Sequence, residues 1–546
     1  MLLAQVLNEP AISEPFLWGV LILAVGMLLW DTIEVGRNDA ANIVNAVFGA
    51  RILTRERAVL VAGIGVVLGA SLSSGVMDTA RKGIFNPAEF HFYKQVLTIY
   101  ISVYVVDTIL LYSYSAFGMP VSTTMTLVFE LLGASFFMGW VFVEGKDPVN
   151  WDKAGDVIQG IIWSIILSAI LGYILMRISR WLMGPDSADL RMSKRVGVWI
   201  AGGLLAILAY FMVVKGMKEV TIIGAFKKWL GQAWIVQCEI GSMKSISLGE
   251  TAFVLVAWLV FGGICRAILG VYQEKAAKLL FPVLTVIGML AMAFAFGQND
   301  LANAAAPGLA AVTLTNSYHA GESLSAAIKP ALPQWALFGC GILLVLGMST
   351  KHAQRVTRAE VNTGSAGATV RLWAPQWCIY LAKIILKLRP SPKPSTAPKV
   401  TVNSQGKTVH YDPLRGSIIM SVSASVIATA SALKLPVSTT YVAFAAVLST
   451  GAADRIFARG DAALKMARFI WVVFSWFMAA VIAAVMAGFV ALLIYQAGVF
   501  GMVLCIGANL VIRRTIKRRS DAQEERVKRE AAERRHPEEY ALEDED

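Results

Sequence analysis

Long apolar segments separated by short polar loops make up most of the chain. At ~1.5 Å per residue, a helix of about 20 residues crosses the ~30 Å hydrocarbon core of a bilayer. The pattern therefore predicts an all-α polytopic membrane protein. The segments fall at about residues 16–48, 58–77, 96–118, 121–143, 156–176, 196–214, 249–270, 279–315, 332–348, 415–432, 436–453, 467–495 and 499–512.

Two of these segments contain the same polar motif, a carboxylate flanked by amides. It is Gly36–Asn42 (GRNDAAN) in the first half and Gly297–Asn303 (GQNDLAN) in the second. Polar residues in hydrocarbon are costly, so we expect both motifs to line a buried site. Matching interruptions in two halves are typical of a transporter site at a repeat interface, and they predict a bent or discontinuous helix at each motif.

A second duplicated motif, PVSTT, occurs at Pro120–Thr124 and at Pro436–Thr440. Proline favours the first helical turn, and Ser or Thr can cap a helix start. Each motif follows an apolar stretch with no charged loop between, which predicts two re-entrant helical hairpins with tips buried in protein. A helix start within the membrane attracts an anion, because free N–H groups and the positive end of the helix dipole meet there.

Composition and charge agree with a membrane protein. Mean hydropathy is +0.61, and 56% of residues are hydrophobic. Lysine and arginine gathered in cytoplasmic loops explain the net charge of +12 better than nucleic-acid binding does. The five cysteines are widely spaced with no CxxC pair, which disfavours a disulfide framework or a structural metal site. No P-loop or Ser-His-Asp arrangement is recognisable, so neither an enzyme nor a cofactor is expected.

The distribution of basic residues predicts the topology. The stretches 177–195, 351–415 and the tail after Arg513 are basic, and they share one side if each hairpin returns to its own side. The positive-inside rule makes that side cytoplasmic, with the amino terminus outside and the carboxyl terminus inside. The first amide-carboxylate motif then runs inward and its copy outward, which predicts an inverted repeat in the plasma (inner) membrane.

The two halves suggest a division of the chain. Within 349–414, residues 370–388 are amphipathic and suit either the headgroup layer or an ordinary cytoplasmic helix, and Arg389–Pro398 is a proline-rich linker. We expect a first repeat at 1–195, connecting helices at 196–278, the start of the second repeat at 279–348, a cytoplasmic insertion at 349–414, the rest of the second repeat with a final helix at 415–512, and a charged tail at 513–546.

The paired motifs, in this order and with the run Asp78–Ile84 (DTARKGI) after the second span, resemble the inorganic phosphate transporter (PiT) family. The resemblance implies secondary transport of inorganic phosphate coupled to sodium or protons, through two inverted repeats, and it leaves a homodimer open. The chain departs from the family at several positions. The family commonly has a small residue at Arg37 and Gln298, a histidine at Met125 and Tyr441, and a glutamate in the second span.

Charge suggests how the motif residues divide between anion and cation. Hydroxyl, amide and backbone N–H donors suit a buried phosphate, whereas a carboxylate repels it. Carboxylates with neutral oxygens, including carbonyls freed by the broken helices, suit sodium, and the same carboxylates would take up the protons if protons replace it. The expected phosphate ligands are Asn38, Asn42, Ser122, Thr123, Thr124, Asn299, Asn303, Ser438, Thr439 and Thr440, and the expected cation ligands are Asp39, Asp300 and Glu130.

Several alternatives stay open. The same machinery would suit sulfate or another tetrahedral oxyanion, and the polar motifs could instead line an anion channel or the pocket of a phosphate sensor. Glu130 is equally suited to be a buried neutral side chain that is hydrogen-bonded to a neighbouring hairpin. Arg37 either neutralises substrate charge or pairs with Glu34, which lies three positions away on the same helical face, and we favour the ion pair.

Overall fold

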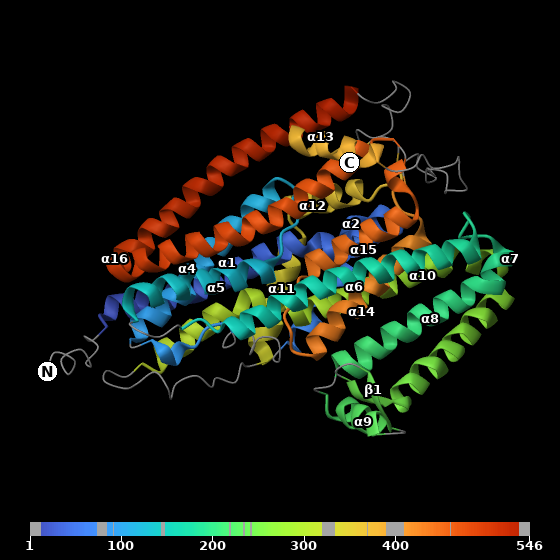
Figure 1. Ribbon diagram of the computed structural model, residues 1–546, viewed down its shortest axis with the longest axis horizontal. Coiled ribbons are helices and arrows are strands. Elements are labelled where there is room, and N and C mark those ends of the chain that lie inside the picture. The colour runs from blue at the N-terminus through green and yellow to red at the C-terminus, as the bar shows by residue number, and fades with distance from the viewer. Residues whose placement is uncertain are drawn as a thin grey trace.

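The protein is an all-α polytopic membrane protein with one short antiparallel β-hairpin in its described part (Figure 1). The computed structural model describes residues 12–73, 84–90, 92–143, 148–217, 220–232, 235–240, 243–318, 334–367, 370–388, 409–458 and 460–533. The elements are α1 (Glu14–Gly49), α2 (Arg55–Ala70), η1 (Pro87–Glu89), α4 (Tyr93–Ala116), α5 (Thr123–Phe142), α6 (Trp151–Met183), α7 (Leu190–Met192), η2 (Ser193–Gly197), α8 (Val198–Ala209), η3 (Tyr210–Gly216), α9 (Thr221–Gln232), β1 (Ile235–Ile240), β2 (Met243–Ser247), α10 (Leu248–Asn316), α11 (Gln334–Met348), α12 (Lys351–Thr363), α13 (Gln376–Lys387), α14 (Pro413–Ala432), α15 (Thr439–Ala453), η5 (Ile456–Ala458) and α16 (Ala462–Glu533).

The helices fit a membrane in length and composition. Among the described residues, eight helices are long and apolar enough to cross a bilayer, or nine if α11 and α12, bent by 68° at their junction, count as one span. Two of the long helices each contain a sharp break in the backbone. Gln273 (φ 42°) divides α10, and Gly498 (φ 58°) divides α16, so each of these is two helices in sequence.

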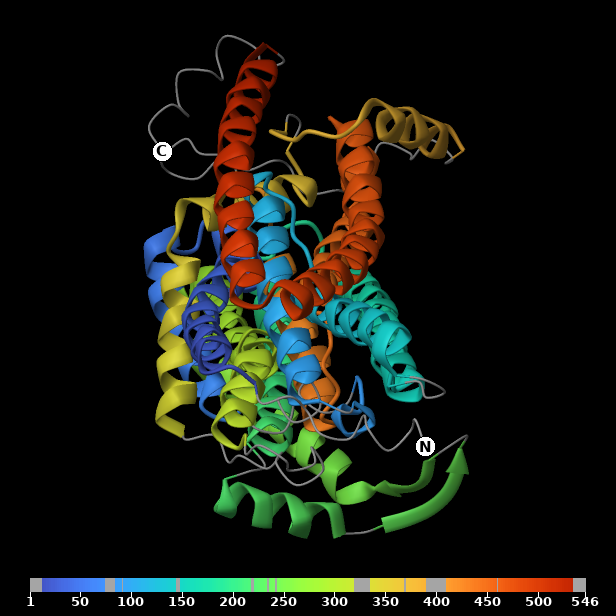
Figure 2. The ribbon, with the colours of Figure 1, turned by 90° about the vertical axis from the view of Figure 1, so that its left-hand side faces the viewer.

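Contacts at the two ends of the bundle show that α1 and the second part of α10 run in opposite directions. At one end Ile12 N donates to the Tyr318 hydroxyl (3.0 Å). At the other end His410 N donates to Gly49 O (2.9 Å), and the Thr285 hydroxyl lies 3.1 Å from Pro413 O. We call this second end the basic end, since α12, α13 and the last turns of α16 extend from it (Figure 2). The opposite end, which carries α9 and the β-hairpin, we call the far end.

The three basic segments of the chain meet at the basic end. Arg180, at the end of α6, pairs with Asp412 (2.6 Å), which also accepts the Ser187 hydroxyl (2.6 Å). Arg355 of α12 pairs with Asp521 near the end of α16 (2.5 Å). The expected clustering of these segments on one side is therefore confirmed for their described residues.

Both hairpins return to the end from which they start. For α14 and α15, Arg180 holds Asp412 before the first helix and Asp454 after the second. For α4 and α5, the Tyr495 ring contacts Phe142 (4.5 Å between centroids) and the ammonium of Lys94 (4.7 Å). Each hairpin thus enters and leaves on one side, as the hairpin count required.

The expected breaks at the amide-carboxylate motifs are wrong. α1 is one helix of 36 residues through Asn38 and Asp39, and the non-helical residue of α10 is Gln273, far from Asn299. Both helices remain continuous at the motifs because the motif side chains make the hydrogen bonds to neighbouring elements. The backbone therefore does not need to unwind to make them. The expectation that broken helices supply free carbonyls fails for the same reason.

The PVSTT residues of both hairpins are buried, as expected. The turn between α14 and α15 in the second hairpin is not buried. Pro436 to Thr440 are buried, whereas Leu433 is 65% exposed. The 20 residues of α14 are long enough, at ~1.5 Å each, to bring the chain close to the far end before it turns. The motif then lies on the returning segment, inside the protein.

The insertion at 349–414 contributes helices to the basic end. α12 packs against α1, where Asn45 donates to the buried Glu360 carboxylate (2.5 Å). The amphipathic stretch forms α13, whose Trp377 contacts Trp471 and Phe474 of α16 while Tyr380 is 67% exposed. The run Asp78–Gly83, the linker Arg389–Pro398 and the end of the tail lie outside the described residues.

Candidate functional site

The two amide-carboxylate motifs place equivalent side chains on one face of each helix. Asn42 donates to Asp39 Oδ1 (2.9 Å) in α1, and Asn303 donates to Asp300 Oδ1 (2.9 Å) in α10. Residues three apart are neighbours on a helix, so the shared spacing produces the same contact twice. All four side chains are buried.

The two PVSTT motifs form capped helix starts. The Ser122 hydroxyl accepts from Met125 N (3.0 Å) at the start of α5, and the Ser438 hydroxyl accepts from Tyr441 N (3.1 Å) at the start of α15. Both serines have extended backbone, as an N-cap requires. Their hydroxyls are therefore engaged with the helix, which leaves the other N–H groups of each first turn without an intrahelical acceptor.

The two hairpin starts touch each other through reciprocal contacts. The Thr124 hydroxyl donates to Val437 O (3.0 Å), and the Thr440 hydroxyl lies 3.2 Å from Val121 O. The same two carbonyls accept the motif amides, Asn299 at Val437 O (2.6 Å) and Asn38 at Val121 O (2.6 Å). Side chains of each helical motif thus fix the backbone of one hairpin tip.

Thr123 lies between the two motif carboxylates. Its hydroxyl is 3.1 Å from Asp300 Oδ1 and 3.3 Å from Asp39 Oδ2, and it accepts from the Asn303 amide (3.0 Å). Thr440 donates to Asp39 Oδ1 (2.7 Å). Two helices and two hairpins from distant parts of the chain therefore converge on one buried group of hydroxyls, amides and carboxylates.

Several buried oxygens in this group lack a hydrogen-bond partner. Among the described residues, none lies near Asn42 Oδ1, Asn303 Oδ1, Asp300 Oδ2 or the Thr439 hydroxyl. Pro307, which has no N–H, also deprives the Asn303 carbonyl of its usual helical donor. Neutral oxygens left without donors beside carboxylates have the chemistry of a hard-cation site. The described residues contain no cluster of three or more His, Cys, Asp or Glu suited to a metal ion.

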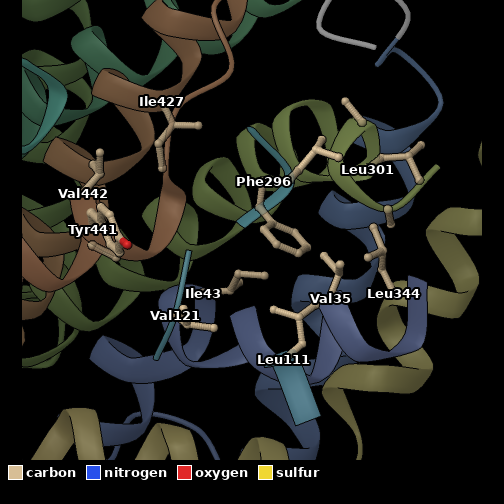
Figure 3. Close-up of a cluster of buried hydrophobic side chains, with 14 of the residues drawn as sticks. Val35, Ile43, Leu111, Val121, Phe296, Leu301, Leu344, Ile427, Tyr441 and Val442 are labelled. Atoms are coloured by element: carbon tan, nitrogen blue, oxygen red, sulfur yellow. The ribbon is translucent and has the colours of Figure 1, made fainter. Parts of the chain in front are cut away.

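Buried apolar side chains from the same elements form a cluster next to the motif residues in the sequence. Val35 and Ile43 of α1, Phe296 of α10 and Tyr441 of α15 converge with Val121 from the first hairpin (Figure 3). All five are at most 2% exposed. An apolar surround strengthens electrostatic interactions with any charge that the polar group holds.

Glu130 does not belong to this group. Its carboxylate is buried with no hydrogen-bond partner among the described residues, and its electrostatic neighbours are Asp107 and Asp31. Asp107 accepts the Thr126 hydroxyl (2.8 Å). The sequence analysis missed Asp31 and Asp107, although an isolated carboxylate within an apolar span was a signal that could have identified either residue.

The expected ion pair of Arg37 is confirmed. Arg37 contacts both oxygens of Glu34 (2.9 and 2.7 Å), and Arg513 of α16 contacts the same carboxylate. Asn509 of α16 donates to the Thr108 hydroxyl (2.8 Å) nearby. Arg37 is therefore held by a network around the buried Glu34 carboxylate that also anchors α16 on α1.

The sequence matches a known family over most of its length. The model described as "Phosphate transporter family" matches residues 35–359 and 396–487, which include all four motifs. The chain belongs to the phosphate transporter family. This is a family of transporters rather than enzymes, and it agrees with the resemblance deduced from the motifs.

Relatives of this phosphate transporter family member have similar length. A protein of Pyrococcus horikoshii, named as a candidate phosphate permease, is 26% identical over 480 residues, covering 87% of this chain and 97% of the relative. A Haemophilus influenzae protein with the same description is 24% identical over 475 residues, covering 85% of this chain and 94% of its own length.

A solved structure has the same fold. It is described as "The sodium-dependent phosphate transporter", and it superposes with a TM-score of 0.61 at 20% sequence identity. The match covers 86% of this chain and 98% of that structure. The shared fold therefore extends over most of this chain.

Proposed function

We propose that the protein is a secondary active transporter that carries inorganic phosphate together with a cation, sodium or a proton. The observation that carries the proposal is the position of Thr123, within hydrogen-bond distance of both Asp39 and Asp300 where two hairpin tips meet. Two buried carboxylates this close repel each other unless a cation or proton accompanies them. The name of the structural neighbour favours sodium.

The donors of the site suit the anion. The helix starts at Thr123 and Thr439 bring free N–H groups and the positive ends of two dipoles to one place. The Thr439 hydroxyl, which has no hydrogen-bond partner among the described residues, adds a donor. The hydroxyls of Thr123, Thr124 and Thr440 and the amides of the four motif asparagines become donors to the anion when they exchange their present acceptors for it. In this arrangement Ser122 and Ser438 position the helix starts, and their contribution to binding is through the backbone.

The same geometry couples the two solutes. A phosphate placed at the hairpin tips lies beside Asp39 and Asp300, which repel it while they are charged and unaccompanied. A cation bound between these carboxylates and the free amide oxygens of Asn42 and Asn303 removes the repulsion. Cation and anion therefore raise each other's affinity, which is the linkage that a symporter requires.

Alternating access follows in this proposal from the two antiparallel motif helices and the two hairpins. They are treated as inverted repeats that rock about the central site. The basic end is assigned to the cytoplasm, which places the amino terminus outside, in the plasma membrane. Support comes from the meeting of the basic segments at that end.

Uptake of radiolabelled phosphate into proteoliposomes, with sodium and pH gradients varied independently, tests the proposal. We expect saturable accumulation driven by one of the two gradients, lost in Asp39→Asn and in Asp300→Asn. Asp152→Asn is the matched control, because this carboxylate is exposed at the start of α6. Flux that follows only the phosphate gradient would indicate a channel. Stronger inhibition by sulfate than by arsenate would reassign the substrate.

A further inference from the structure

A cavity at the basic end lies outside the central site. Its wall is formed by α12, by residues 371–373, by Arg468 near the start of α16, by the last turns of α16, and by residues 116–118 at the end of α4. Figure 2 shows these last turns of α16 projecting beyond the membrane helices. We call this space the basic cavity, and its charged lining residues are Arg355, Arg358, Arg371, Arg468, Lys528 and Glu524.

Cations outnumber carboxylates in the lining of the basic cavity. Four arginines and one lysine face one carboxylate, that of Glu524. Glu524 pairs with Arg358 (3.1 Å) and Lys528 (3.7 Å), and it also contacts Arg355. Asp521, just outside the lining, pairs with Arg355 (2.5 Å). Even with Asp521 counted and Arg371 left aside, positive charge is in excess around the cavity.

The arginines are held in place by backbone carbonyls. Arg468 is 3% exposed and donates to Trp373 O (3.0 Å) and Gly118 O (2.6 Å). In the described part of the chain it makes no ion pair. Arg355 donates to Ala116 O (3.3 Å) as well as to its acidic partners. Guanidinium groups fixed around a cavity match the geometry of a phosphate group, which accepts several N–H donors at once.

A salt-bridged contact between α12 and α16 is the simpler interpretation, and it accounts for Glu524 and Asp521. It leaves the buried cation of Arg468 without a counter-ion, however. A buried charge is costly unless it is paired, and here an anion in the cavity would complete the pairing.

We propose that the basic cavity is a second anion site that binds a phosphate group, supplied either by free inorganic phosphate or by the headgroup of an acidic phospholipid. The bound anion shares the arginines with Glu524, so it adds to the contacts that hold the end of α16 against α12. Through Gly118 and Ala116, the site also touches the turn that leads to Ser122. The site is independent of sodium, since its charge balance involves neither Asp39 nor Asp300.

Equilibrium binding of radiolabelled phosphate to the purified full chain, in detergent without acidic lipid, tests the free-anion source. We expect one site that requires the coupling cation and a second that persists when sodium is replaced by choline at fixed pH. Asp39→Asn should remove only the first. The pair Arg358→Gln and Lys528→Gln should weaken the second at least tenfold, since both side chains are partly exposed (40% and 54%) and tolerate the change.

Matched controls separate local from general charge effects. The pair Arg518→Gln and Arg519→Gln removes the same charge from exposed positions of α16 outside the lining, and it should leave the second site unchanged. Glu524→Gln removes the competing carboxylate, so it should tighten phosphate at the second site. This gain of affinity cannot arise from a failure to fold.

Nanodiscs made with and without phosphatidic acid test the lipid source. If the headgroup is the occupant, phosphatidic acid stays bound in native mass spectrometry, and its retention falls with Arg358→Gln and Lys528→Gln but not with the control pair. The proposal is overturned if neither sodium-independent phosphate binding nor retention of phosphatidic acid is detected. It is also overturned if the cavity variant and the control variant bind the same amount of phosphate and of phosphatidic acid. Neither result bears on coupled transport at the central site.

Discussion

Thr123 is the residue at which the two halves of the chain meet. Its hydroxyl contacts one carboxylate from each motif and accepts an amide from the second motif. The sequence predicted its place in the site because the PVSTT motif is duplicated. The bridging position depends on how the hairpins pack together, so it could not be predicted from spacing.

Replacing Thr123 with valine keeps the volume and removes the bridge. We expect phosphate uptake to fall about 10- to 100-fold, the equivalent of the ~1.5–3 kcal/mol attributed to hydrogen bonds with charged groups. Thr429→Val is the control, since that hydroxyl bonds only within its own helix, to Ser425 O (2.7 Å). Equal uptake by the two variants would show that the bridge plays no part in transport.

Arg180 joins the two ends of the second hairpin. It pairs with Asp412 before α14 and with Asp454 after α15, and its side chain is 10% exposed. Arg180→Gln leaves the buried carboxylate of Asp454 and the partly buried carboxylate of Asp412 without their cation, which we expect to cost about 3 kcal/mol of stability. A lower midpoint of thermal unfolding in detergent would show this loss. Arg177→Gln, at an exposed position of the same helix, should behave as wild type.

The motif helix α1 packs unusually close to α11. A Cβ on Gly36 would lie 2.0 Å from Leu344 O, and one on Gly347 would lie 2.1 Å from Ile33 O. Small residues on both helices let their backbones approach, as is common in membrane bundles. This contact fixes the position of α1 against α11, and with it the position of Asn38 and Asp39 in the helix bundle.

Gly36→Ala should therefore separate the two helices. Overpacking of this kind costs about 1–3 kcal/mol, and we expect lower thermal stability together with weaker phosphate binding. Gly26→Ala on the same helix meets nothing within 4 Å and should be neutral or slightly stabilising. If Gly36→Ala unfolds at the temperature of Gly26→Ala, the close contact does not exist.

The elements show where prediction from sequence succeeds and where it stops. Hydropathy located the spans, and the duplicated motifs identified the residues that converge. The expected breaks at Asn38 and Asn299 were wrong because unwinding depends on whether neighbouring elements satisfy the polar side chains, and the carbonyls of Val121 and Val437 do so here. Asp107 was missed because it has no copy in the second half.

The whole molecule has a basic end and a far end. Arg180, Asp412 and Arg355 bring the basic segments together at the first, while α9 lies at the second. The proposed topology assigns the basic end to the cytoplasm by the positive-inside rule. Under that proposal, the antiparallel course of the two motif helices gives each half the opposite orientation to the membrane.

Thiol labelling in intact cells tests this orientation. Arg519→Cys places a thiol on an exposed position at the basic end, and Trp229→Cys places one on α9, where the side chain is 64% exposed. An impermeant maleimide should label the second in intact cells and the first only after permeabilisation. The reverse pattern would invert the proposed topology. Four of the five native cysteines, Cys265, Cys340, Cys378 and Cys505, are buried and should contribute little background, and Cys238→Ser in both variants removes the fifth.

The central claim is that anion and cation occupy one shared site. Measuring phosphate affinity as a function of sodium concentration and pH tests this claim most directly. In purified protein with the basic cavity disabled by Arg358→Gln and Lys528→Gln, we expect phosphate to bind at least tenfold more tightly when the coupling cation is saturating, and Asp39→Asn to abolish this dependence. Phosphate affinity that is the same at every sodium concentration and pH would contradict the account.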